Sequence, residues 1–189
     1  MFFFNALSVS LALAASTLAA VTPLSKRQDI PANCIPNLKY VGYYGDSITQ
    51  YDASCYNLAS TCLDSARNGS TDIWSIKTCV AAQTCDPKTA YLFGCLNSNV
   101  ANTTHLDYNV YANIVGDCAW ADGGCPITQQ NYIDFIYSAL SEIGSSVYPS
   151  SVDTVTSSWW TPIVNWAATG TTIPYTNFDD WLHYGGFYN

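Results

Sequence analysis

A serine at a sharp turn is the first residue of this chain that could carry chemistry. Ser47 lies in the segment 45–49, GDSIT, which directly follows the apolar run 38–44. The run is rich in residues that favour β-structure and a glycine breaks it, so the sequence predicts a strand that ends in a tight turn. A turn of this kind can present a hydroxyl as a nucleophile. Ser47 is therefore a candidate nucleophile.

The same segment resembles the first motif of the SGNH (GDSL) hydrolases. In that family the serine is the nucleophile, and a late Asp-x-x-His supplies the catalytic histidine and its orienting acid. Asp180 and His183 have this spacing near the end of the chain. The resemblance implies an α/β fold and an ester hydrolase in which Ser47 attacks a carbonyl, His183 transfers the proton and Asp180 orients the imidazole.

The resemblance covers only these two short motifs. The family's middle block, Gly-x-Asn, does not occur in the sequence, because the segment 94–97, GCLN, is one residue too long. In the family that asparagine completes the oxyanion hole, and losing one such donor lowers the rate by about 10²- to 10³-fold. The ester hydrolase is therefore an alternative and not the main expectation.

Paired carboxylates are a second source of chemistry, because a general acid and a base or nucleophile can hydrolyse a glycosidic bond. Glu142 is the only glutamate of the chain. Its candidate partners are the aspartates Asp117, Asp122, Asp153, Asp179 and Asp180. The pattern around Glu142 favours the ordinary role of a solvated acid at the end of an amphipathic helix.

Metal binding is not expected. The two histidines, His105 and His183, each lack a second histidine at helical spacing. The acid-rich loop 117–124 does not match the spacing of an EF-hand. We therefore expect no metal and no cofactor.

Tryptophans offer the best case for ligand binding, because an aromatic face packs well on the apolar face of a sugar ring. Trp120 lies in a short loop between two cysteines, and Trp159 and Trp160 are adjacent. Two adjacent rings cannot easily both face inward on one helix, so we expect one of this pair to be exposed. The main expectation is a secreted protein that binds an extracellular glycan or another organism's protein.

The N-terminal residues predict export. Residues 1–19 have the short apolar core and small residues of a signal peptide, and residues 20–27 end in a dibasic pair that resembles the processing sites of fungal secreted proteins. Removing that pair leaves 6 − 2 = 4 basic residues against 14 acidic ones, a net charge of −10. With so few basic side chains, nucleic acid and anionic membranes are poor partners. We expect an extracellular monomer.

Eight cysteines follow the expected processing site. An even number in an oxidising compartment predicts four disulfides, whose pairing the sequence leaves open. The cysteines are Cys34, Cys55, Cys62, Cys79, Cys85, Cys95, Cys118 and Cys125. Acceptor sequons at Asn68 and Asn102 predict glycosylation at the surface.

The elements that must position these residues are mainly helical. Apolar residues recur at helical spacing in segments that begin at capping residues or proline and mostly end at glycine. The expected helices are 52–66, 73–84, 87–96, one from Thr103 or Thr104 to Gly116, 128–143, 161–170 and 177–184, the last capped by Thr176 with Asp179. We therefore expect a single, mainly α domain of short helices, residues 28–189, stapled by disulfides and with at most a small β element. It would have a cysteine-rich lobe, 28–125, and a cysteine-free, aromatic-rich lobe, 126–189.

Overall fold

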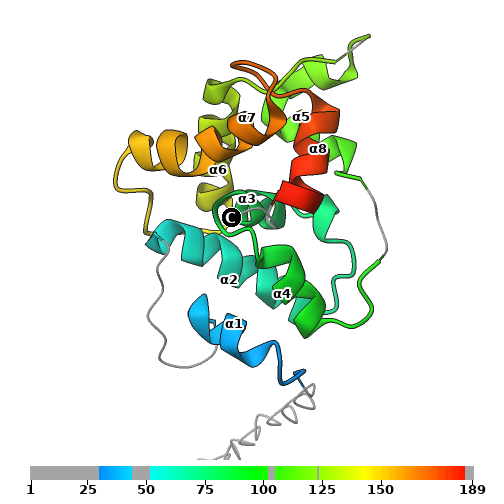
Figure 1. The fold of residues 1–189 in the computed structure, drawn as a ribbon, viewed down its shortest axis with the longest axis vertical. Helices are drawn as coiled ribbons and strands as arrows, with labels where there is room; N and C mark the ends of the chain where they lie inside the picture. The colour runs from blue at the N-terminus through cyan, green and yellow to red at the C-terminus, as the bar shows by residue number, and fades with distance from the viewer. Residues whose placement is uncertain (1–29, 44–51, 102–104, 123, 186–189) are drawn as a thin grey trace, which may run out of the picture.

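The computed structural model of the protein describes residues 30–43, 52–101, 105–122 and 124–185. These residues form eight α-helices and three short segments of 3₁₀- or π-helix, arranged as shown in Figure 1. In chain order they are α1 (Ile35–Tyr40), α2 (Ala53–Arg67), η1 (Ile73–Ser75), α3 (Lys77–Cys85), α4 (Thr89–Leu96), α5 (Tyr108–Val115), η2 (Gly116–Trp120), α6 (Gln129–Glu142), η3 (Thr154–Trp160), α7 (Thr161–Ala167) and α8 (Tyr175–Tyr184). The prediction of a mainly helical domain stapled by disulfides is confirmed.

In the described residues, β-structure is confined to one backbone pairing. Ile127 and Ile173 form an isolated antiparallel bridge. The amide of Ile127 donates to the carbonyl of Ile173 at 2.7 Å, and the amide of Ile173 donates back at 2.9 Å. Since these parts of the chain contain no sheet, the alternative expectation of an α/β SGNH-like fold is wrong.

Helix α3 is the centre of the fold. Its residues from Thr78 to Cys85 are all buried, so it shows no amphipathic stripe. Helices α2 and α4 lie on one side of it in Figure 1, and α6 and α8 lie on the other. Its short side chains, including Ala81 and Ala82, let these neighbours approach closely. One hydrophobic cluster runs through the core from Cys34 to Leu182.

Two disulfides join α2 to α3. Cys55 pairs with Cys85, and Cys62 pairs with Cys79. Because the order of the partners is reversed along the second helix, α2 and α3 run antiparallel. The remaining disulfides tie the residue before α1 to α4, through Cys34–Cys95, and close the loop Cys118–Cys125.

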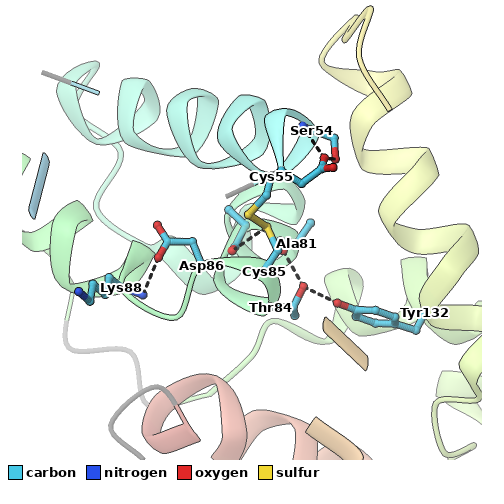
Figure 2. Close-up of a disulfide and its surroundings, with 10 residues drawn as sticks. Ser54, Cys55, Ala81, Thr84, Cys85, Asp86, Lys88 and Tyr132 are labelled. Atoms are coloured by element: carbon cyan, nitrogen blue, oxygen red, sulfur yellow. Dashed lines mark hydrogen bonds between the residues drawn. A yellow bond between two sulfur atoms is a disulfide. The ribbon is translucent and has the colours of Figure 1, made fainter. Parts of the chain in front are cut away.

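A buried hydrogen-bond chain accompanies the Cys55–Cys85 disulfide, as Figure 2 shows. The hydroxyl of Tyr132, on α6, donates to the Thr84 hydroxyl at 2.7 Å, and Thr84 donates to the Ala81 carbonyl at 2.6 Å. The fully buried Tyr132 thus has a partner for its polar end, as a buried tyrosine requires. Burial raises the pKa of this phenol well above its usual range.

The strand expected over 38–44 is wrong for its described part, residues 38–43. Residues Ile35–Tyr40 instead form α1, whose first turn contains Pro36, where a missing N–H costs no helical hydrogen bond. Leu38 is fully buried, and Gly42 follows the helix with a φ of 76°. The apolar side chains Leu38 and Val41 therefore reach the core from a short helix and the residue that follows it.

Helix α6 follows its sequence pattern closely. The expected range was 128–143, and the helix spans Gln129–Glu142 with Thr128 as its N-cap. The Thr128 hydroxyl accepts from the amide of Asn131, and the Asn131 side chain accepts from the amide of Thr128. Such a reciprocal capping box fixes where a helix begins.

Other helix starts differ from the expected ones. The helix expected over 73–84 is divided by Ile76, which is extended, into η1 and α3. Helix α5 is capped by Asp107, whose carboxylate accepts from the amide of Asn109 at 2.7 Å; Thr103 and Thr104 lie outside the described residues. Helix α8 begins after Pro174 and has no side-chain cap. The Asp179 carboxylate accepts from the Leu106 amide, outside the helix.

Candidate functional site

Three aromatic rings from separate elements meet at the surface. Tyr108 is the first residue of α5, Trp120 is the last of η2 and Tyr175 is the first of α8. The ring centroid of Tyr108 lies 5.2 Å from that of Trp120 and 4.9 Å from that of Tyr175. Trp120 is 60% exposed and Tyr108 is 38% exposed. We call Tyr108, Trp120 and Tyr175 the aromatic surface.

The aromatic surface rests on buried contacts. The buried ring of Tyr111 lies 5.6 Å from that of Tyr108 and 5.0 Å from that of Tyr175, and its hydroxyl donates to the Cys125 carbonyl. The bridge between Ile127 and Ile173 brings the chain that follows Cys125 beside the chain that precedes Tyr175. The exposed rings of Tyr108 and Trp120 and the half-buried ring of Tyr175 are therefore held on backbone that the core and a disulfide position.

A buried carboxylate links α8 to the segment that leads into α5. Asp179 Oδ1 accepts from the Leu106 amide at 2.7 Å, and Asp179 Oδ2 lies 2.8 Å from His105 Nδ1. The Tyr175 hydroxyl donates to the Leu106 carbonyl at 2.5 Å. Both polar backbone groups of Leu106 are thus bonded to α8, which fixes the residue that comes two positions before Tyr108.

His183 lies on the same helix face as Asp179. Its Nδ1 is 2.8 Å from the Asp179 carbonyl oxygen and 3.4 Å from Asp179 Oδ1. Its ring packs at a tilt against that of Trp74, with 4.5 Å between the ring centroids. Because a carbonyl only accepts, Nδ1 carries the hydrogen. Among the described residues, His183 Nε2 is buried and has no hydrogen-bond partner.

The catalytic residues expected from the sequence are only partly described. Ser47 lies outside the described residues, so its role as nucleophile stays a prediction. Asp180 is exposed, and the carboxylate beside the imidazole of His183 is that of Asp179. The orienting role expected for Asp180 is therefore better suited to Asp179, which the i,i+4 spacing places next to His183.

The adjacent tryptophans are both buried, and the expectation that one of them is exposed is wrong. Trp159 is 6% exposed and Trp160 is 4% exposed. They lie on η3, a π-helical segment that contacts α3, α6 and α7. The Trp160 ring packs 5.2 Å from that of Tyr132 on α6. A helix covered on more than one side can bury two successive rings, so neither of these tryptophans offers a face to a ligand.

Two tyrosines of the site hold their protons strongly. Burial first, and then the charge of Asp179 with smaller effects from its neighbours, raises the pKa of Tyr175 to about 12. Burial likewise raises the pKa of Tyr111 to about 12, with the nearby Tyr108 adding to the effect. Both rings therefore stay neutral across the physiological range of pH.

Glu142, the glutamate considered for glycan hydrolysis, is paired with a lysine. Glu142 Oε2 pairs with Lys77 Nζ at 2.9 Å, at the end of α6, as expected of a solvated acid. Asp117, Asp122 and Asp153 are exposed. Among the residues that the structure describes, His, Cys, Asp and Glu form no group of three or more positioned to hold a metal ion.

The glycosylation sequons differ in what the structure describes. Asn68 is exposed just after α2, where a glycan could reach solvent, and Asn102 lies outside the described residues. Occupancy of both sites stays a prediction. The expected signal peptide, 1–19, and propeptide, 20–27, also lie outside the described residues.

A hollow of about 280 Å³ lies between α2 and the end of α6. Its lining is mostly polar: Asn57, Ser60, Thr61, Ile143, Gly144, Ser145 and Ser146. The Asn57 amide donates to the Ser145 hydroxyl at 3.0 Å, and Ser145 donates to the Val147 carbonyl at 2.6 Å. Because these polar groups bond to one another and the volume is at the small end for ligand pockets, about 300 Å³, the aromatic surface is the better candidate site.

Comparisons of the chain with protein-family models, with curated proteins and with solved structures found no match. Within residues 30–43, 52–101, 105–122 and 124–185, none of the helices combines the length and the apolar character needed to cross a bilayer. The four disulfides fit a secreted, extracellular protein. A function for the aromatic surface therefore has to follow from the chemistry of its own residues.

Proposed function

We propose that this secreted, disulfide-stabilised protein binds an extracellular glycan through the aromatic surface. The observation that carries the proposal is the exposed indole of Trp120, which is held in a loop closed by Cys118–Cys125 and packs at a tilt against the Tyr108 ring. Large exposed aromatic rings in contact with one another are unusual at a surface that only faces water. A ligand with flat apolar faces would cover them.

The size and chemistry of the surface favour a sugar over a protein partner. A specific protein interface buries about 800 Å² on each partner. Three neighbouring rings instead match about one or two sugar units, whose CH faces stack on aromatic rings. Since Tyr108 and Tyr175 begin helices and Trp120 lies in a closed loop, little conformational entropy is lost when a ligand binds.

We expect the mature, oxidised protein to be retained on insoluble chitin or β-glucan and the Trp120→Ala variant to be retained far less. Truncating a central aromatic residue of a binding site costs about 2 kcal/mol or more, which corresponds to roughly a 30-fold loss of affinity. The measurement is the fraction of protein depleted from solution at increasing amounts of glycan.

Trp166→Ala is the matched control, because Trp166 is 36% exposed but lies on α7, outside the aromatic surface. It should bind like the unmodified protein. Equal retention of the Trp120→Ala and Trp166→Ala variants, or no retention on any glycan, would contradict the proposal.

We expect a serine-directed organophosphonate to leave Ser47 unmodified. In the SGNH hydrolases that the segment 45–49 resembles, an α/β sheet carries the nucleophile, and the described residues contain no such sheet. Intact-mass measurement on the oxidised mature protein, with Ser47→Ala alongside, checks this. Labelling that disappears in Ser47→Ala would instead establish an ester hydrolase, with His183 as the candidate base.

A further inference from the structure

The charges of the chain are distributed unevenly. Lys88 is the last lysine or arginine in the sequence, and the aromatic surface lies entirely in the part that follows it. Apart from the two histidines, every ionisable side chain there that is charged at neutral pH is acidic. These residues are Asp107, Asp117, Asp122, Asp134, Glu142, Asp153, Asp179 and Asp180. The elements that carry the aromatic surface, α5, η2 and α8, therefore together contain acidic side chains and neither lysine nor arginine.

Several of these carboxylates belong to the elements that form the surface. Asp107 caps α5 and directly precedes Tyr108. Asp179 lies one turn after Tyr175 on α8. After burial, its charge and that of Asp107 help to raise the pKa of Tyr175. Asp117 and Asp122 are exposed on either side of Trp120 in the chain.

We infer that the glycan bound by the aromatic surface carries free amino groups, as a glucosamine polymer does. The inference rests on the proposed function and names its ligand class. An ammonium group is attracted both to the face of an indole or phenol ring and to nearby carboxylates. The same field repels glycans that carry uronic acids or sulfates, and it gives no advantage to neutral ones.

Asp107 is the residue that best separates this inference from general attraction to positive charge. An asparagine caps a helix about as well as an aspartate, so Asp107→Asn removes the charge and keeps the start of α5. Asp153→Asn removes an equal charge from an exposed position where the side chain makes no cap hydrogen bond. The two variants have the same net charge and differ only in where the charge is lost.

The test measures binding of soluble glucosamine oligomers and of N-acetylglucosamine oligomers of equal length, by titration calorimetry or tryptophan fluorescence. The mature, oxidised protein is used at mildly acidic pH, where both the amines and the exposed carboxylates are charged. We expect the glucosamine oligomer to bind about tenfold more tightly, with a preference that falls as salt is raised. Asp107→Asn should reduce the preference several-fold and leave binding of the acetylated oligomer unchanged, whereas Asp153→Asn should preserve it.

Each other result has a definite meaning. Equal binding of both oligomers, lost in Trp120→Ala, would overturn the inference and leave the proposed function standing. Binding of neither oligomer would overturn the inference, and it would overturn the proposed function as well if neither chitin nor β-glucan retained the protein. Equal effects of Asp107→Asn and Asp153→Asn would show attraction by net charge alone and overturn the inference. A lysine oligomer that binds as tightly as the glucosamine oligomer, and depends on Trp120 to the same extent, would replace the glycan with a basic protein partner.

Discussion

Replacing Cys55 and Cys85 together with alanine is expected to lower the free energy of unfolding by about 3 to 4 kcal/mol. The two cysteines are 30 residues apart, so the disulfide removes considerable freedom from the unfolded chain. Both side chains are buried where α2 meets the end of α3, so their loss also leaves unfilled space in the core. Urea denaturation followed by circular dichroism measures the change.

The disulfide that closes the Trp120 loop provides the comparison. Cys118 and Cys125 are only 7 residues apart, so the same double replacement should cost about 2 kcal/mol. This variant should lose glycan retention out of proportion to its stability, because Trp120 would no longer be held beside Tyr108. Equal decreases in the free energy of unfolding of the two double variants would contradict the central role of α3 in the stability of the fold.

Asp179→Ala is expected to lower the free energy of unfolding by about 2 to 3 kcal/mol, because it leaves the buried amide of Leu106 without its acceptor and removes a charged hydrogen bond. The variant should also bind glycan less tightly, since Leu106 positions the start of α5 and hence Tyr108. Thermal unfolding and glycan depletion, measured on the same preparation, check the two effects.

Asp180→Ala is the control for this second variant. Asp180 is the next residue in the chain but is exposed, so its replacement should change stability by no more than about 0.5 kcal/mol. Similar losses in the two variants would mean that Asp179 has no special role in joining α8 to α5.

Local patterns were sufficient to predict several helices. Helix α6 has a regular apolar stripe and a complete capping box, and α2 has Asp52 as its cap, so both sequence ranges were close. The strand predicted over 38–44 is wrong for residues 38–43 because β-propensity mainly reflects packing against neighbouring strands. Here Leu38 packs in a helical core. The pairing of Cys55 with Cys85 and of Cys62 with Cys79 depends on the antiparallel contact of α2 and α3, which no local pattern encodes.

Of the three residues of the aromatic surface, the sequence predicts only Trp120. Trp120 stood out because it lies between two cysteines close in sequence. Tyr108 and Tyr175 are 67 residues apart, and only the packing of α5 against α8 brings their rings together. The sequence pattern places Asp179 in the cap of its own helix because a pattern indicates only local hydrogen bonds, whereas its carboxylate bonds to Leu106, 73 residues earlier in the chain.

Three of the four disulfides form a concentric set. The Cys62–Cys79 loop lies inside the Cys55–Cys85 loop, which lies inside the Cys34–Cys95 loop. Because the entropy lost on closing a loop grows with its length, each inner bond shortens the free chain that the next bond has to close. This nesting favours oxidation that proceeds outward from α2 and α3, with the bond between the start of α1 and α4 closing last.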